Sequence, residues 1–197
     1  MKKNKLDIIF LLDRSGSMSG SENNTINSYN SYLSKQKKNK YLTKITTILF
    51  DDQYEILFNR ENIKEVKYLT NKEYYVRGCT ALYDAIGKTI NFYSRQIKNK
   101  VLFIIITDGL ENASREFDKL RIKQLIQNHP NWEFIYLGAN IDTYSEATKI
   151  GIKESNIASY QKTKKGFNDL FEAVDEATIS LLKHDNLSNK WNQRLND

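Results

Sequence analysis

Residues 7–17 read DIIFLLDRSGS, an apolar run that ends at an aspartate and is followed by two serines at alternate positions. In an extended loop, side chains two residues apart point the same way, so the hydroxyls of Ser15 and Ser17 can converge near Asp13. Gly16 gives the backbone freedom to close the turn. Oxygen donors that gather without histidine or thiolate suit Mg²⁺, Mn²⁺ or Ca²⁺ rather than zinc. Taken alone the pattern is a weak signal, because serine-rich turns that cap helices also follow strands.

Two further stretches carry donors of the same kind. The segment RGCTALYDAIG places Thr80 just before a helix and after the flexible Gly78, and IIITDGLENAS ends another apolar run with Asp108. Ligands of open parallel sheets bind at the carboxyl ends of the strands. If the strands that end at Asp13 and Asp108 are neighbours, both aspartates meet at one rim. Thr80 then approaches from the intervening loop, and the three stretches form one candidate cation site.

The apolar pattern predicts the elements that must hold these donors. Short, nearly continuous apolar runs are typical of strands buried on both faces of a parallel sheet. They occur at residues 6–12, 44–50, 101–107 and 132–138, and a further short strand is expected at 156–160. Segments with helical spacing lie between and after them, at residues 27–36, 81–97, 117–127, 143–150 and 166–184.

One connection is too short to hold a helix. In ILFDDQYEILF, two aspartates separate two strand-like runs, which predicts a hairpin and an antiparallel edge strand at 53–58. The elements together predict an α/β fold: a three-layer, doubly wound, Rossmann-like sheet that is mostly parallel, with one antiparallel edge strand and helices on both faces. We expect one domain over residues 1–197, with its core at about 5–185 and a short C-terminal tail at 186–197.

The composition is that of a globular protein. Hydrophobic residues make up 40% and charged residues 27% of the chain, close to the average for soluble domains. The single cysteine, Cys79, excludes an internal disulfide framework and a cysteine-built zinc site. The apolar runs are far shorter than the roughly 20 residues of a membrane span, and Asp7 interrupts any secretory signal. We therefore expect a cytoplasmic protein without a membrane partner.

The net charge is +6, and lysines cluster at residues 2–5, 35–40 and 162–165. Such clusters either attract nucleic acid and acidic partners or form solvated helix ends. We favour solvated lysines, and association with nucleic acid or a ribonucleoprotein is the alternative function.

The three donor stretches together resemble a von Willebrand factor A domain with a metal-ion-dependent adhesion site, over roughly residues 5–185. The segments YVRGCTALYDAIG and FIYLGANIDTYSEATKIGI are similar to a compact bacterial and phage branch of that family. The family's D-x-S-x-S motif, loop threonine and T-D-G aspartate match Asp13, Ser15, Ser17, Thr80 and Asp108. The resemblance implies a non-enzymatic protein that binds Mg²⁺ (or Mn²⁺ or Ca²⁺) and captures an Asp or Glu carboxylate of a protein partner.

In such sites the hydroxyls bind the metal directly, while the aspartates often act through water. Because the nearest donors are neutral, the dication keeps much of its charge and attracts a carboxylate. A metal-dependent phosphohydrolase with Asp13 as nucleophile is the minor alternative. It is disfavoured because Ser15 and Ser17 occupy the stretch where its second acidic residue is expected.

Further residues are candidates for supporting the metal or for forming a rim that contacts a partner. Asp51 is more readily explained as a hairpin-turn residue. Glu111 and Asn112 either hold a water beside the metal or cap a turn. Cys79, where Gly or Ser is more usual in the family, is expected to be a small buried loop residue. The full set of these candidates is Gly16, Met18, Asp51, Tyr75, Cys79, Leu110, Glu111 and Asn112.

Overall fold

A computed structural model of the chain describes residues 6–139 and 142–196. Within these residues the strands form one six-stranded sheet, in the order β3-β2-β1-β4-β5-β6. The strands are β1 (Leu6–Asp13), β2 (Thr43–Phe50), β3 (Tyr54–Asn62), β4 (Lys100–Thr107), β5 (Trp132–Gly138) and β6 (Ile157–Ser159). Only the edge pair β2–β3 is antiparallel. The mostly parallel α/β sheet with one antiparallel edge strand is therefore confirmed.

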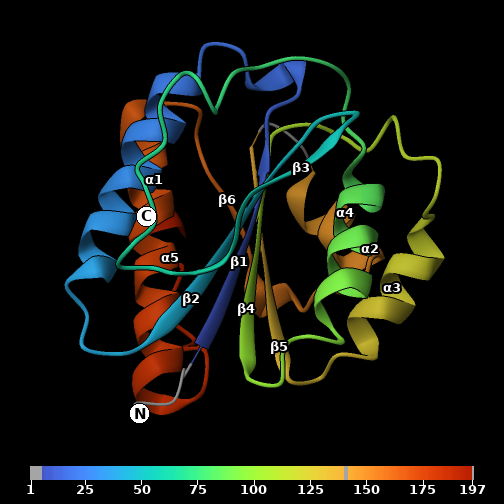
Figure 1. Cartoon of the computed structure of the whole chain (residues 1–197). Coiled ribbons are helices and arrows are strands. Elements are labelled where there is room, and N and C mark those ends of the chain that lie inside the picture. The colour runs from blue at the N-terminus through green and yellow to red at the C-terminus, as the bar shows by residue number, and fades with distance from the viewer. Residues whose placement is uncertain (1–5, 140–141, 197) are drawn as a thin grey trace.

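Helices cover both faces of this sheet (Figure 1), with α1 and α5 on one face and α2, α3 and α4 on the other. They are α1 (Glu22–Lys37), α2 (Leu82–Tyr93), α3 (Lys119–Gln127), α4 (Thr143–Lys149), α5 (Lys164–His184) and the short α6 (Gln193–Asn196). None of the helices in the described part of the chain is both long and apolar enough to span a membrane.

Strand β1 shows why the central strands are apolar on both faces. Phe10 and its even-numbered neighbours join the core cluster under α1 and α5, where the Phe10 ring lies 5.4 Å from that of Tyr29. Ile9 and Leu11 join the second cluster, under α2 and α3. Because successive side chains of a strand point to opposite faces, a strand covered by helices on both sides is apolar over its middle. The two aspartates of β1 lie near its ends, where Asp7 pairs with Arg60 and Asp13 accepts from Thr107.

The element ends differ from the expected ones where local geometry extends or shortens them. β3 continues to Asn62, past the expected end at 58, because register shifts opposite residues 45–48 and a positive φ of 50° at Arg60 let the pairing resume. The first helix begins at Glu22 rather than at 27. The second ends at Tyr93 rather than at 97.

The segment after α5 is part of the core rather than a loose tail. Trp191 is 1% exposed and belongs to the cluster on the α1–α5 face. Its indole Nε1 donates a hydrogen bond to the Ser155 carbonyl oxygen at 2.9 Å. The expected boundary at 185 therefore does not mark the end of the packed structure.

We predict that Trp191→Ala lowers the free energy of unfolding by about 3–5 kcal/mol, because it removes a large buried ring. Trp191→Phe keeps most of the ring and loses the indole hydrogen bond, so its loss is smaller. Urea unfolding followed by circular dichroism measures both. The exposed Leu120→Ala (68% exposed) is the control, with an expected change within about 0.5 kcal/mol. Equal stability of Trp191→Ala and the parent protein would contradict the assignment of this segment to the core.

Candidate metal-binding site

The pairing of β1 with β4 brings two of the predicted donors to one edge of the sheet. Leu12 lies opposite Ile106 in the parallel register. The next residues along each strand are therefore side by side, and the Thr107 hydroxyl donates to Asp13 Oδ2 at 2.5 Å. Asp108 follows at the carboxyl end of β4. The prediction that these two strands are neighbours in the sheet is therefore confirmed.

The side-chain oxygens of the two loops that follow β1 and β4 lie close together. Ser15 Oγ lies 3.0 Å from Ser17 Oγ. Ser17 Oγ in turn donates to Asp108 Oδ1 at 2.5 Å. The Ser15 backbone N–H donates to Asp13 Oδ1 at 2.7 Å, which fixes the turn after β1. Two loops that are far apart in sequence thus share one continuous chain of oxygen atoms.

Thr80 reaches the same place from a third loop. A Cβ atom built on Gly109 would lie 2.7 Å from Thr80 Oγ1 and 3.1 Å from Ser17 Oγ, so both hydroxyls border the space beside this glycine. Thr80 is held there by Asn112, whose Oδ1 accepts from the Thr80 N–H at 2.8 Å. The structure therefore brings the five predicted donors together, and Gly109 is needed to leave room for them.

Asp13 is a buried carboxylate, and the described residues that donate hydrogen bonds to it, Ser15 and Thr107, are neutral. Burial raises the pKa of Asp13 from 3.8 to about 6, although the hydrogen bonds from Thr107 and Ser15 favour the charged form, and the negative charge of Asp108 adds to the rise. A bound cation lowers the pKa of a nearby carboxyl. The Asp13 carboxylate is therefore a group whose charged form a cation bound at this rim would stabilise.

The donor set fits a hard divalent cation. In the described ranges, no three His, Cys, Asp or Glu side chains form a group that could hold a metal. Any ion at this rim therefore depends on the hydroxyls of Ser15, Ser17 and Thr80 beside the two carboxylates. A set made only of oxygen atoms suits Mg²⁺, Mn²⁺ or Ca²⁺ better than softer metals.

Asp51 forms ion pairs with two arginines. Its Oδ2 accepts from Arg14 Nε at 3.2 Å and from Arg77 Nε at 2.6 Å, and its Oδ1 accepts from the Gln53 N–H at 2.6 Å. The Arg14 side chain is 0% exposed, and its Nη1 lies 2.8 Å from Glu55 Oε2. Asp51 therefore neutralises a buried arginine, a role that sequence reasoning missed because nothing in the sequence links residues 14 and 51.

Glu111 and Asn112 connect the loop after β4 to the start of α2. Glu111 Oε2 accepts from the Tyr83 N–H at 2.8 Å, and its Oε1 accepts from the Ser114 N–H at 2.8 Å. A carboxylate is favourable at a helix N-terminus. Of the two alternatives for these residues, the observed contacts are those of caps.

The remaining candidates divide between the core and the surface. Met18 is fully buried and packs in the core rather than at a partner-facing rim, whereas Tyr75 and Leu110 are 44% and 53% exposed. The Gly16 N–H donates to the Gly78 carbonyl at 3.0 Å and so joins the first and second donor loops.

The expectation that Cys79 is buried is wrong, since its side chain is exposed. Neighbouring side chains of an extended segment point in opposite directions, so the inward-facing Thr80 (2% exposed) turns Cys79 outward.

Lys162 is a contact of the site that sequence reasoning did not identify. Its Nζ lies 2.5 Å from Asp108 Oδ2 and donates to the Ser17 carbonyl oxygen at 2.5 Å. The residue lies in the loop between β6 and α5, directly before Thr163, whose side chain caps α5. In the sequence it appears only as one lysine of a basic cluster, without a pattern that links it to Asp108.

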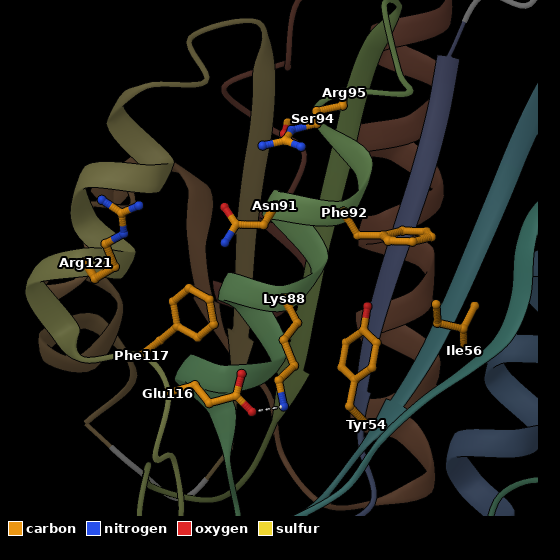
Figure 2. A pocket seen from close by; sticks show the side chains of 10 residues that line it. All are labelled: Tyr54, Ile56, Lys88, Asn91, Phe92, Ser94, Arg95, Glu116, Phe117 and Arg121. Atoms are coloured by element: carbon orange, nitrogen blue, oxygen red, sulfur yellow. Dashed lines mark ion pairs between the residues drawn. The ribbon is translucent and has the colours of Figure 1, made fainter.

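A separate groove of about 700 Å³ lies between α2, α3 and the edge strand β3 (Figure 2). Its lining combines aromatic side chains, such as Phe92 and Phe117, with basic ones, such as Arg121. Among the described residues that line it, the carboxylate Glu116 is paired with Lys88 at 2.7 Å. The single carboxylate among these described lining residues is thus already compensated by a lysine.

We predict that Asp13→Asn stabilises the protein in the presence of a chelator. The raised pKa means that the folded state holds the Asp13 proton more tightly than the unfolded chain, so stability falls as the pH rises from 3.8 to about 6, and the whole loss is present above that range. The difference from 3.8 to about 6 corresponds to roughly 3 kcal/mol at neutral pH. The gain of the variant should be largest at pH 7 and vanish below about pH 3, where Asp13 is protonated in both states.

Urea unfolding in EDTA at several pH values measures this gain. Asparagine keeps the shape of the side chain, and its Nδ2 can donate to Thr107 Oγ1. A pH-independent loss of stability would show that the charge of Asp13 is already compensated within the fold.

We predict that Asp51→Asn lowers the free energy of unfolding by about 3 kcal/mol or more, because it leaves the buried Arg14 with insufficient negative charge. If Mn²⁺ raises the melting temperature of the parent protein, the same shift should persist in the variant, because Asp51 pairs with arginines. Thermal unfolding with and without Mn²⁺ tests both statements. Normal stability together with a lost Mn²⁺ shift would instead assign Asp51 to the metal.

Several solved structures share this fold. Proximal thread matrix protein 1 from the mussel byssus matches with a TM-score of 0.65 and 16% identity, over 87% of this chain and 45% of that chain. A second structure of that protein, with a zinc-occupied MIDAS motif, matches with a TM-score of 0.62 and 17% identity, over 87% and 45%. The ArnB paralog VWA2 from Sulfolobus acidocaldarius matches with a TM-score of 0.59 and 20% identity, over 88% and 45%.

The chain spans less than half of the length of each of these proteins. No curated protein sequence matches it. The family model described as the von Willebrand factor type A domain matches residues 7–176, which is most of the chain. The chain therefore belongs to the von Willebrand factor type A domain family.

Proposed function

We propose that this domain is a non-enzymatic binding module that captures an acidic side chain of a protein partner through a divalent cation held at the carboxyl rim of its sheet. Domains of this family commonly mediate metal-dependent protein interactions. The observation that carries the proposal is the convergence of hydroxyl and carboxylate oxygens from three loops, joined by the Ser15–Ser17 contact and the Ser17–Asp108 hydrogen bond.

In this proposal the hydroxyls of Ser15, Ser17 and Thr80 hold the ion. Asp13 and Asp108 position the two serines by accepting hydrogen bonds from the Ser15 N–H and the Ser17 hydroxyl. The ion supplies a concentrated positive charge that attracts the partner's carboxylate. Because the three hydroxyls that bind it directly are neutral, the ion's charge is not neutralised by its nearest ligands. We propose Mg²⁺ or Mn²⁺ as the ion, with Ca²⁺ as the alternative. The zinc-occupied MIDAS motif of the mussel protein supports a divalent metal in this fold.

The surface around the site supports contact with a protein. Tyr75 is exposed, and its ring centroid lies 5.5 Å from the Arg14 guanidinium carbon and 5.6 Å from that of Arg77. Cation–π contacts hold such a ring in place. Exposed aromatic side chains with a fixed orientation are favourable interface residues. Tyr75 and Leu110 would add affinity beside the orienting contact at the ion.

The geometry of Asp13 argues against the phosphohydrolase alternative. The residue is 0% exposed, and its two carboxylate oxygens accept from the Ser15 N–H and the Thr107 hydroxyl. A nucleophilic carboxylate needs an oxygen that is directed at the substrate. The bonds of Asp13 suit a residue that positions its neighbours.

The contacts of the lysines argue against nucleic-acid binding. Lys35 pairs with Glu172, and Lys165 pairs with Asp169 at 2.7 Å. Lys37 donates to the Val66 carbonyl oxygen at 2.5 Å. The basic cluster at residues 2–5 lies outside the described residues. Since Lys35 and Lys165 are paired with carboxylates, less of their charge is available for a phosphate backbone.

We predict that the domain binds Mn²⁺ or Mg²⁺ and that Ser17→Ala and Thr80→Ala each weaken this binding at least tenfold, because each removes a donor. Isothermal titration calorimetry with the metal alone measures the effect. The matched control is Ser19→Ala, which changes an exposed serine two residues from Ser17. Metal binding that survives both donor substitutions would place the ion elsewhere.

Capture of a carboxylate is tested separately with acetate. If acetate coordinates the ion, bound Mn²⁺ will strongly shorten the relaxation times of its methyl protons, and the effect will vanish in EDTA and in Ser17→Ala. The protein could instead bind Mn²⁺ and shorten the acetate relaxation times only as much as an uncoordinated ion nearby does. That result would contradict carboxylate capture.

A further inference from the structure

Lys162 places a positive charge directly against the donor cluster. Its Nζ lies 2.5 Å from Asp108 Oδ2 and 2.5 Å from the Ser17 carbonyl oxygen. The Asp108 side chain is 1% exposed and that of Lys162 is 22% exposed. A charge pair with this little exposure is screened much less by water than a surface pair. The lysine is therefore an electrostatic component of the site.

The formal charges of the site show how Lys162 changes its net charge. Asp13 and Asp108 contribute two negative charges, which a divalent cation balances. Without Lys162 the loaded site is neutral, and an incoming carboxylate leaves it with a net negative charge. With Lys162 the loaded site carries one positive charge, and a carboxylate brings it to neutrality. The ammonium repels a dication bound by the same residues, and it attracts the anion that binds after the dication.

We propose that Lys162 sets the charge balance of the site, so that it weakens binding of the divalent cation and strengthens binding of the partner's carboxylate. The inference rests on the proposed function and adds a residue that determines its specificity for acidic ligands. It makes the domain a weaker binder of the free ion, and the ion-loaded domain a stronger binder of a carboxylate. Lys162 thereby shifts favourable electrostatic free energy from binding of the ion to binding of the carboxylate.

The position of Lys162 supports a defined role. It precedes Thr163, whose hydroxyl accepts from the Gly166 N–H at 3.0 Å as the N-cap of α5. A Cβ built on Gly166 would lie 2.0 Å from the Gln161 carbonyl oxygen, so the chain packs tightly on both sides of the lysine. The start of this long helix thus holds the backbone from which Lys162 reaches the site.

The test is Lys162→Met, which keeps the length of the side chain and removes its charge. Calorimetry with Mn²⁺ alone should show binding that is tighter by on the order of tenfold. Relaxation of acetate protons by the bound Mn²⁺ should show an acetate dissociation constant that is several-fold higher. These changes have opposite signs, which a simple loosening of the loop does not produce.

Two control variants distinguish the effect of the Lys162 charge from the effect of a changed loop structure. Lys162→Arg keeps the charge and should leave both constants near those of the parent protein. Lys165→Met removes a nearby charge whose side chain is 85% exposed and pairs with Asp169, and it should also change neither constant appreciably.

Weaker binding of both ligands by Lys162→Met, or no change in either, would overturn the inference while leaving the proposed function intact. Tighter Mn²⁺ binding with unchanged acetate binding would overturn the role toward the carboxylate. Absence of Mn²⁺ binding in the parent protein and in Lys162→Met alike would overturn the proposed function itself, and this inference with it.

Discussion

The parallel pairing of β1 with β4 is the constraint on which the rest of the site depends. The two strands end together, so the side chains of Asp13 and Thr107 meet in a 2.5 Å hydrogen bond, and the loops that follow begin from fixed neighbouring points. The contacts among Ser15, Ser17 and Asp108 are made within and between these two loops, whereas Thr80 and Lys162 reach the cluster from other loops. Burial of both strands between two helical layers makes this alignment rigid, because a slip in register would move apolar side chains out of the two cores.

Two of the buried aspartates at this rim have charges that are compensated differently. Asp51 is compensated within the fold by Arg14 and Arg77. Among the described residues, the donors to the Asp13 carboxylate are neutral, the Ser15 N–H and the Thr107 hydroxyl, and burial raises its pKa to about 6. The Asp51 ion pairs need no further charge, whereas a cation bound near Asp13 would stabilise its buried charge. This contrast, within one fold, separates a structural ion pair from the proposed cation site.

The sequence predicts the sheet and the donors because both are encoded locally. Apolar runs identify the buried strands, and the residues that follow them identify the rim. Contacts between distant residues carry no such pattern. The pairing of Arg14 with Asp51 and that of Lys162 with Asp108 span long stretches of chain and depend on where each loop closes. Trp191 likewise looks like part of a polar terminal segment until its packing against the core is seen. The outward orientation of Cys79 follows from the inward orientation of Thr80, which requires the assembled cluster.

That outward orientation has a practical consequence. The chain contains one cysteine, and its thiol is exposed one residue away from Thr80. A maleimide-linked fluorophore or spin label will therefore attach at a unique position beside the carboxyl ends of the strands, without prior removal of other thiols. Such a reporter senses local changes in charge and crowding in real time, so occupancy of this edge can be followed in the unmutated protein and in complex mixtures.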